Sequence, residues 1–334
     1  MIRSTRAVRS AAMALAVSLP FALSACGGAE NAESAPASQG DCPGTPVTVV
    51  VSVDQWGDIV SQLGGACADV TTVLASSSVD PHDYEPAPSD AVAFEGAQLV
   101  VVNGGHYDEW AAKLASTSAP DAPVVNAVEL SGGHADEEHD HGGEAGHEHA
   151  EEHDHAGEAN PHVWYKPEAV RAVAEEVTSR LSALSADAAG YFAERHTEFD
   201  ESMKPYDDAI AAIKAGAPGR SFAATESVFD DMAAALGLAD RTPAGYRAAA
   251  ANESEPSPAD LDAFLALLSG RGADVLIYNT QTEGSVPEQI RAAAEQAGVP
   301  VVEVTETLPP EAKTFQDWQV AQLQSLAKAF GVAT

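Results

Sequence analysis

Residues 47–53 read Val-Thr-Val-Val-Val-Ser-Val, a continuous run in which nearly every side chain is β-branched. A run of this kind is typical of a strand buried in a parallel sheet. The pattern then predicts a helix at 55–63, strands at 70–74 and 97–102, a helix at 107–114 and a strand at 123–128. Strands that alternate with helices over short connections indicate an α/β lobe with a parallel sheet.

A second series of the same kind is expected in the C-terminal part of the chain. Ser257 and Pro258 there are a typical N-cap and first residue of a helix. The strands are predicted at 221–224, 274–278 and 299–304, and the helices at 228–236, 258–268, 286–297 and 313–330. The sequence therefore predicts two α/β lobes, each with its own parallel sheet.

Two helices are predicted between the lobes, over 167–186 and 190–215. In the second, apolar residues recur every three or four positions, which indicates one long helix. Pro205 lies inside it and is expected to bend or break it, because proline lacks a backbone N–H. The predicted fold class is α/β, with two lobes joined by a single long helix. The expected boundaries are an N-terminal lobe at 45–189, a linking helix at 190–217 and a C-terminal lobe at 218–334.

Residues 1–25 have the pattern of a signal peptide, in which three arginines precede a short apolar stretch at 11–23. This stretch is too short to span a bilayer. Small residues then lead into Cys26, and this resembles a bacterial lipobox, which implies cleavage before Cys26 and a lipid on its sulfur. Ordinary secretion, with Cys26 incidental, is the alternative. We expect an extracytoplasmic protein that is anchored to the cell membrane through a flexible tether at 26–44.

The formal charge of the chain is −34, from 51 acidic and 17 basic residues. Such a charge argues against nucleic acid or an anionic membrane surface as a partner, and it suits a protein that concentrates cations. Two cysteines remain besides Cys26, namely Cys42 and Cys67. In an oxidising compartment they are candidates for a disulfide at the start of the first strand–helix unit.

Residues 134–159 interrupt the α/β pattern, because all 26 are His, Asp, Glu, Gly or Ala. Nothing in that composition builds a core, so the sequence predicts a mobile surface loop. A solvated acidic spacer is the plain interpretation, but seven histidines in 26 residues favour an auxiliary role in metal binding. These histidines are His134, His139, His141, His147, His149, His153 and His155.

Two further histidines lie directly after a proline, on loops that lead back into regular structure. His82 follows Pro81 beyond the strand at 70–74, and ligands of open α/β sheets bind beyond the carboxyl ends of strands. His162 follows Pro161 just after the histidine-rich loop. His82 alone also fits a solvated surface group, but two Pro-His turns in one chain favour a pair of metal ligands.

Two glutamates occupy similar places in the C-terminal series. Glu226 lies where the strand at 221–224 turns into a helix, and Glu306 lies just past a later buried strand. An acidic residue at a helix N-terminus is also stabilised by the helix dipole, which is the plain interpretation of Glu226. Glu306 follows Glu226 by 80 residues, which is also the separation of His82 from His162. This spacing suits a cleft metal held by two ligands from each lobe.

Together these motifs resemble the metal-receptor lipoproteins of bacterial ABC importers, the family that contains the zinc- and manganese-binding receptors. The resemblance covers residues 45–330 and rests on the long central helix and on Asp80-Pro81-His82, Asn160-Pro161-His162-Val163-Trp164, Thr225-Glu226 and the turn at Glu306. It implies a monomer with one cation in the cleft between the lobes, a permease in the membrane as partner, and no catalytic role. By motif position it implies four ligands, His82, His162, Glu226 and Glu306, with Asp317 as a weaker alternative for the fourth.

The third ligand and the histidine-rich loop favour different metals. Zinc receptors of this family usually have histidine where this chain has Glu226, whereas manganese-type receptors have glutamate there. The loop resembles that of zinc receptors, and imidazole nitrogen favours zinc over manganese. We weigh the loop more heavily and expect Zn²⁺ as the cargo, with Mn²⁺ or Fe²⁺ as the alternative.

Two other classes of function compete with a receptor. A zinc-dependent hydrolase would use two histidines, a carboxylate and a metal-bound water. Against it, the chain has no His-Glu-x-x-His stretch, and Ser227 lies in no Gly-x-Ser-x-Gly elbow. The second competitor is a surface adhesin or a metal store, in which the histidine-rich loop itself would bind the metal.

Overall fold

The computed structural model describes residues 41–75, 84–132, 160–252, 254–282 and 284–334. Residues 37–334 form one compact unit. Several predicted features lie outside the described residues: the signal peptide, Cys26 and most of the tether, His82, and all seven histidines of the loop at 134–159. None of the described helices is long and apolar enough to cross a membrane.

The N-terminal lobe is built on a four-stranded parallel sheet, in the order β2-β1-β3-β4. The strands are β1 (Val47–Val53), β2 (Ala68–Leu74), β3 (Leu99–Val102) and β4 (Val124–Asn126). Val49, Val50 and Val51 of β1 are completely buried. The β-branched run at 47–53 is therefore the central strand of a parallel sheet, as predicted.

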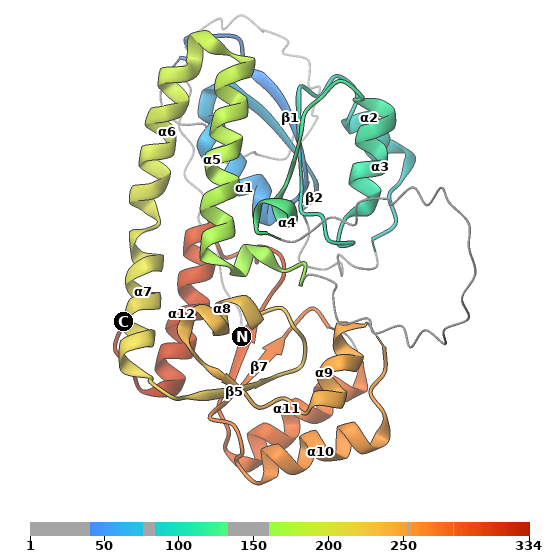
Figure 1. Cartoon of the computed structure of the whole chain (residues 1–334), viewed down its shortest axis with the longest axis vertical. Helices are drawn as coiled ribbons and strands as arrows, with labels where there is room; N and C mark the ends of the chain where they lie inside the picture. Colours follow the sequence, from blue (N-terminus) through green and yellow to red (C-terminus); the bar gives the residue numbers. More distant parts are fainter. Residues whose placement is uncertain (1–40, 76–83, 133–159, 253, 283) are drawn as a thin grey trace, which may run out of the picture. The chain divides into compact units, whose positions relative to one another are not determined.

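Helices cover both faces of this sheet (Figure 1). They are α1 (Asp54–Gly64), α2 (Pro88–Ala93), α3 (Glu109–Ser118), α4 (Ala127–Leu130) and α5 (Pro167–Leu184). Val49 and Val51 belong to the same core as Trp56 of α1 and Val173 of α5, whereas Val50 packs in a separate core with the α2–α3 side. Alternate side chains of β1 thus pack against the helices on opposite faces of the sheet. The sequence did not predict α2, a six-residue helix none of whose side chains is buried.

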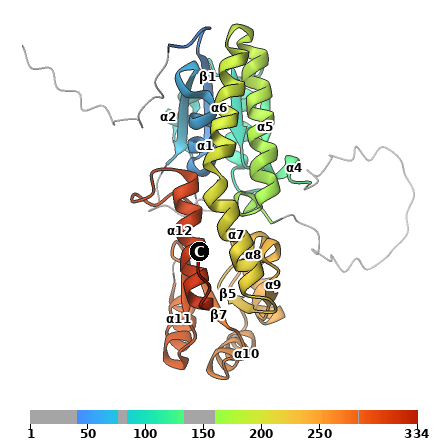
Figure 2. The ribbon, with the colours of Figure 1, turned by 90° about the vertical axis from the view of Figure 1, so that its left-hand side faces the viewer.

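Two helices in line join the lobes, α6 (Ala189–Ser202) and α7 (Lys204–Gly216), as Figure 2 shows. The predicted long joining helix is present, and it is divided at Met203 into these two helices. Pro205 is at the first turn of α7, where a missing N–H costs little. The expected break at Pro205 is therefore present, but the apolar stripe continues through it, because Met203 and Tyr206 are both completely buried.

The C-terminal lobe repeats the first arrangement with a parallel sheet in the order β6-β5-β7-β8. The strands are β5 (Ser221–Ala224), β6 (Ala239–Asp240), β7 (Val275–Asn279) and β8 (Val301–Val304). The helices are α8 (Asp230–Leu236), α9 (Ala244–Ala251), α10 (Pro258–Ser269), α11 (Ser285–Ala297) and α12 (Phe315–Phe330). The hydroxyl of Ser257 accepts a hydrogen bond from the Asp260 N–H at 3.2 Å and caps α10 as predicted. The sequence did not predict β6 and α9, which are two and eight residues long.

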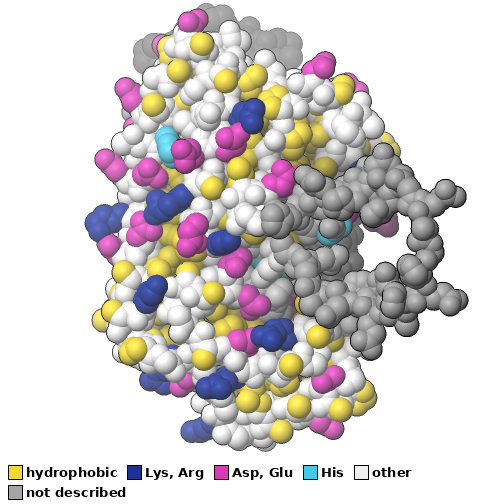
Figure 3. Space-filling model, in the orientation of Figure 1, with side chains coloured by type: hydrophobic (Ala, Val, Ile, Leu, Met, Phe, Trp, Pro, Cys, Tyr) yellow, Lys and Arg dark blue, Asp and Glu magenta, His cyan; other side chains and the backbone are white. Residues whose placement is uncertain are grey.

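Acidic and basic side chains are interspersed over the face shown in Figure 3. Arg171 of α5 pairs with Asp207 of α7 at 2.7 Å, and Lys204 pairs with Asp208 at 2.8 Å. The negative charge of the chain is therefore not gathered into a single patch on this face.

Cys42 and Cys67 form a disulfide with a Cα–Cα distance of 5.0 Å. It ties the segment before β1 to the 3-10 turn (Gly65–Cys67) that follows α1. Cys67 is completely buried in the larger core of the structure. The bond therefore closes the first strand–helix unit of the N-terminal lobe.

Replacing Cys42 and Cys67 by serine should lower the free energy of unfolding, because the disulfide closes a loop with a sequence separation of 25 residues. The loop-closure entropy predicts a loss of about 3 kcal/mol. For a chain of this size that lowers the unfolding temperature by roughly 5 °C, as calorimetry would measure. The oxidised wild type is the reference, and reduction of the wild type should give the same shift. An unchanged unfolding temperature in both cases would contradict the prediction.

Candidate metal centre

The carboxyl ends of the strands in the C-terminal lobe bring three polar side chains together. Glu226 follows β5 by two residues, Asn279 is the last residue of β7, and Glu306 follows β8 by two residues. β5 and β8 both pair with β7, so their ends lie on either side of Asn279. Ligand sites of open α/β sheets form in such places, and here the segment that carries His162 completes the cluster.

His162 is only 4% exposed and is held by its own loop. Its Nδ1 lies 2.7 Å from Oδ1 of Asn160, which also accepts the backbone N–H of His162 at 3.1 Å. Because a carbonyl oxygen only accepts, Nδ1 carries a proton, and in the neutral imidazole Nε2 then has the lone pair. The Asn160 amide nitrogen donates to the carbonyl of Ser227 at 2.9 Å, and the carbonyl of Pro161 accepts from Asn103 at 2.8 Å. The imidazole is therefore fixed in a tautomer that can bind a metal through Nε2.

Glu306 is 2% exposed and faces His162. Its Oε2 accepts a hydrogen bond from the Tyr107 hydroxyl at 3.1 Å and lies 3.6 Å from Nε2 of His162. Burial, and then the charge of Glu306, raise the pKa of Tyr107, so its hydroxyl stays a donor at neutral pH. Two ligands of a tetrahedral zinc ion stand about 3.3 Å apart, given bonds of roughly 2.0 Å. The spacing of Nε2 and Oε2 therefore fits two ligands of one cation.

Glu226 is partly buried and shares a donor with Glu306. The amide nitrogen of Asn279 lies 2.5 Å from Oε2 of Glu226 and 2.8 Å from Oε1 of Glu306. Burial is the largest cause that raises the pKa of Glu226, and the charge of Glu306 adds to it, whereas the bond from Asn279 opposes it. The two carboxylates thus concentrate negative charge where water is scarce, which a divalent cation would offset.

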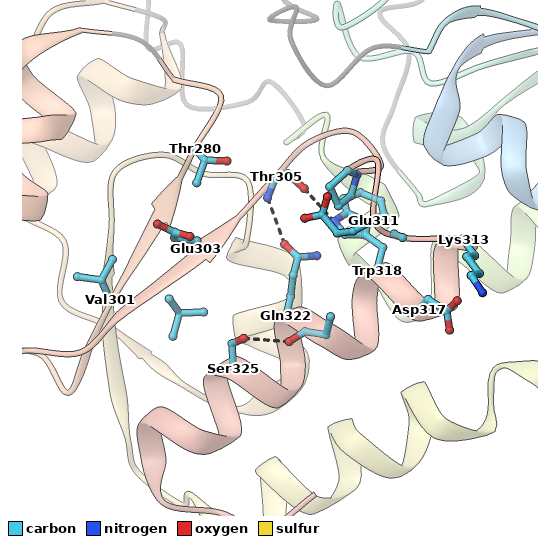
Figure 4. A pocket seen from close by; sticks show the side chains of 14 residues that line it. Thr280, Val301, Glu303, Thr305, Glu311, Lys313, Asp317, Trp318, Gln322 and Ser325 are labelled. Carbon is cyan, nitrogen blue, oxygen red and sulfur yellow. Dashed lines mark hydrogen bonds between the residues drawn. The ribbon is translucent and has the colours of Figure 1, made fainter. Parts of the chain in front are cut away.

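Of the predicted ligands, the structure brings together His162, Glu226 and Glu306. Asp317 is exposed in the first turn of α12 and lines a surface pocket of about 610 Å³ between β8 and α12 (Figure 4). His82 lies outside the described residues. Within the part of the chain that the structure describes, no three His, Cys, Asp or Glu side chains are grouped closely enough to hold an ion. A complete site therefore needs a further ligand or a small movement of the carboxylates.

Sequence reasoning missed the polar residues that hold the charged ones, namely Asn160, Tyr107, Gln281 and Asn279. The Oε1 atom of Gln281 accepts the backbone N–H of Glu306 at 2.7 Å and so fixes the turn after β8. A signal for Asn279 was present, because it ends a buried strand in the same way that Ala224 does just before Glu226. Asn279 is neither charged nor a histidine, so a pattern of charged residues and histidines does not include it.

A family model with the description "ZnuA: Zinc-uptake complex component A periplasmic" matches residues 49–329 of the chain. The chain belongs to this family. The description of the family is that of a component of a zinc-uptake complex. The resemblance predicted from the Pro-His motifs is confirmed at the level of the family.

Two relatives of the ZnuA family illustrate the range of similarity. The high-affinity zinc uptake system protein ZnuA of Bacillus subtilis is 26% identical over 299 residues, which cover 88% of this chain and 87% of that protein. The zinc-binding lipoprotein AdcA of Streptococcus pneumoniae is 28% identical over 212 residues, or 61% of this chain. The match spans only 39% of the length of that lipoprotein.

Solved structures confirm the fold of this ZnuA-family chain. A crystal structure of ZnuA superimposes with a TM-score of 0.65 at 19% identity, covering 85% of this chain and 99% of the other. A manganese-bound periplasmic metal binding protein from Candidatus Liberibacter asiaticus gives a TM-score of 0.66 at 18% identity, with the same coverage. At these identities the likeness is one of fold.

The two lobes of this ZnuA-family chain also touch through acidic side chains of α1. Asp58 accepts a hydrogen bond from the backbone N–H of Phe315 at 2.7 Å, and Asp54 lies 3.4 Å from the N–H of Leu308. Burial is the main cause that raises the pKa of Asp54 from 3.8 to about 7, and the nearby charge of Asp58 contributes to it. Near neutral pH the contact therefore holds a carboxylate that takes up a proton readily.

Replacing Asp54 by asparagine should stabilise the protein at pH 8 and have little effect near pH 4. The raised pKa means that the folded state binds the proton more tightly than the unfolded state does, between pH 3.8 and about 7. The free energy of unfolding therefore falls as the pH rises through this window, and the loss is complete above it. We expect a gain of about 1–2 kcal/mol at pH 8, or a few degrees in the unfolding temperature.

Thermal unfolding between pH 4 and pH 8 checks this expectation. The exposed Asp121 supplies the control variant, Asp121→Asn, which should follow the wild type at every pH. A lower unfolding temperature of Asp54→Asn at pH 8 would show that the charged form stabilises the contact, against the prediction.

Proposed function

We propose that the chain captures a divalent transition metal outside the cytoplasm, with Zn²⁺ as the preferred cargo, and delivers it to the permease of an ABC importer. The observation that carries this proposal is the buried pair of His162 Nε2 and Glu306 Oε2, which stand 3.6 Å apart. Imidazole nitrogen and carboxylate oxygen are donors that bind divalent transition metals. Membership of a zinc-uptake family supports Zn²⁺ as the cargo and uptake as the direction of transport.

The proposed ligands are His82, His162, Glu226 and Glu306. Two nitrogen and two oxygen donors suit a tetrahedral zinc ion. An oxygen-rich site with bidentate carboxylates suits six-coordinate Mn²⁺, which is the alternative cargo within the same family. Asp317, the alternative fourth ligand, is not included in this set because it is exposed on α12.

Binding and lobe contact are linked in this proposal. His162 and Tyr107 come from the N-terminal part of the chain, whereas Glu226 and Glu306 come from the C-terminal lobe. A cation bound by both parts therefore strengthens the contact between the lobes, and the liganded form would dock on the permease. Because the ligands must be deprotonated, the affinity should fall as the pH falls.

The proposal includes an anchor and an auxiliary loop. A lipid on Cys26 would keep the receptor, as a monomer, at the outer face of the cell membrane, and one relative is itself described as a lipoprotein. The histidines at 134–159 would capture zinc or sense its abundance near the cleft. Both features lie outside the described residues.

Replacing His162 by alanine should weaken zinc binding by at least about 100-fold, because the variant loses a buried ligand of the central site. Isothermal titration of the metal-free protein measures the effect. His196 on α6 supplies the matched control, and His196→Ala should bind zinc like the wild type. Wild-type affinity in His162→Ala would contradict the proposed site.

Deletion of residues 134–159 separates a receptor from a metal store or an adhesin whose loop binds the metal. A receptor keeps one tight zinc site after the deletion, whereas a store loses nearly all of its binding. The two outcomes differ in stoichiometry as well as in affinity, so the same titration distinguishes them.

Competition between the two metals tests the choice of cargo. The wild type should keep zinc when equimolar Mn²⁺ is added, as metal analysis after desalting would show. Glu226→His should increase the preference for zinc further, because imidazole nitrogen favours zinc over manganese. Manganese retained by the wild type in equimolar zinc would overturn zinc as the cargo and leave the receptor function intact.

A further inference from the structure

The surface pocket between β8 and α12 is lined by other residues than the candidate metal centre (Figure 4). Its volume of about 610 Å³ falls within the usual range of small-molecule sites, about 300–1,000 Å³. Neither His162 nor Glu226 nor Glu306 lines it, although Thr305, which precedes Glu306, forms part of its wall. An inference about this pocket therefore goes beyond the proposed function and does not rest on it.

The inner wall of the pocket is apolar. Val302 and Trp318, each only 2% exposed, line it together with Pro309 and Ala312. The indole N–H of Trp318 donates to the hydroxyl of Thr305 at 2.9 Å, and the ring has no second polar atom. This wall therefore suits the hydrocarbon part of an occupant.

Gln322 adds a buried amide to the wall of the pocket, and its side chain is 7% exposed. Its Oε1 accepts the backbone N–H of Thr305 at 3.2 Å, a bond drawn in Figure 4. Because a backbone N–H only donates, this bond fixes the orientation of the amide. Among the described residues the buried Nε2 of Gln322 has no hydrogen-bond partner. A buried donor without an acceptor is unfavourable, so an oxygen atom of an occupant would stabilise it.

Exposed charged side chains complete the lining, namely Glu303, Glu311, Lys313 and Asp317. Glu303 already pairs with Arg291 at 2.7 Å. That leaves the carboxylates of Glu311 and Asp317 against the one ammonium group of Lys313. Each exposed charge contributes little affinity, but their sum favours an occupant with a positive charge.

The same lining argues against a metal ion and sets a length for the occupant. The group without a partner is an N–H donor, which cannot bind a cation. Asp317 precedes Gln322 by five residues on α12, a rise of about 7.5 Å along the helix axis. An occupant that reaches both residues therefore carries its positive charge at least about 7 Å from its acceptor oxygen.

We propose that this pocket binds a small organic cation with a carbonyl oxygen at the other end of a hydrocarbon chain, as derivatives of arginine and lysine have. The oxygen accepts a hydrogen bond from Nε2 of Gln322, the chain lies on Trp318, and the positive charge faces Asp317. An uncharged carbonyl compound would lack a partner for the carboxylates. A simple alkyl cation would leave the amide of Gln322 unsatisfied.

The test titrates the full chain with two probes and follows binding by calorimetry. Nα-acetyl-argininamide has the cation, the chain and carbonyl oxygens, whereas pentylguanidine lacks the oxygens. We expect saturable binding of the first probe at millimolar concentration and about tenfold weaker binding of the second. Gln322→Leu should weaken the binding of the first probe about tenfold and leave that of the second unchanged, because only the first accepts from Nε2.

A second variant and a matched control complete the experiment. Asp317→Asn should weaken both probes about threefold at low ionic strength and much less at high salt. Asp262 is an exposed acid on α10 of the same lobe, and Asp262→Asn should bind both probes like the wild type.

Three results would overturn the inference. They are no saturable binding of Nα-acetyl-argininamide to the wild type, an equal loss of both probes in folded Gln322→Leu, and wild-type affinity for both probes in Asp317→Asn. The last result decides if Gln322→Leu does not fold. Failure of the proposed function would differ, because zinc titration would then find no tight site while the two probes could still bind.

Discussion

The shared hydrogen bond from Asn279 to Glu226 and Glu306 is the interaction on which the rest of the site depends. Two carboxylates in a place with little water repel each other and lose hydration, and the raised pKa of Glu226 records that cost. The chain offsets it with neutral donors, namely the Asn279 amide and the Tyr107 hydroxyl, and provides no side-chain cation among the contacts described. What remains is a negative centre beside a histidine lone pair, which a divalent cation completes.

The architecture serves this centre by repetition. The two sheets have the same strand order. Helix α6 packs on α1 of the first lobe and α7 packs on α12 of the second (Figure 2). Each joining helix therefore packs against a different lobe. The buried Met203 and Tyr206 carry the core across the junction. A rigid connection of this kind permits small adjustments at the cleft more readily than a wide hinge opening.

Local patterns made much of the fold predictable. The strand at 47–53 matched the structure because β-branched residues favour a buried strand, and the shorter strand at 221–224 matched as well. The two-residue β6 and the alanine-rich α9 gave no such signal. The site was predicted in part: the positions of Glu226 and Glu306 after strands placed them together, whereas Asn279 and Tyr107 take their roles from long-range contacts that no local pattern encodes. The ligand roles of His82, His162, Glu226 and Glu306 stay predictions.

Asn160 holds the His162 ring through its carbonyl oxygen and the Ser227 carbonyl through its amide nitrogen. The Asn160 side chain therefore contacts both the C-terminal lobe, at Ser227, and the ring of His162. Without the bond to Ser227, the Asn160 amide would be held only through its oxygen, by the backbone N–H and the ring of His162. The contact between the lobes and the orientation of the His162 ring therefore depend on the same asparagine side chain.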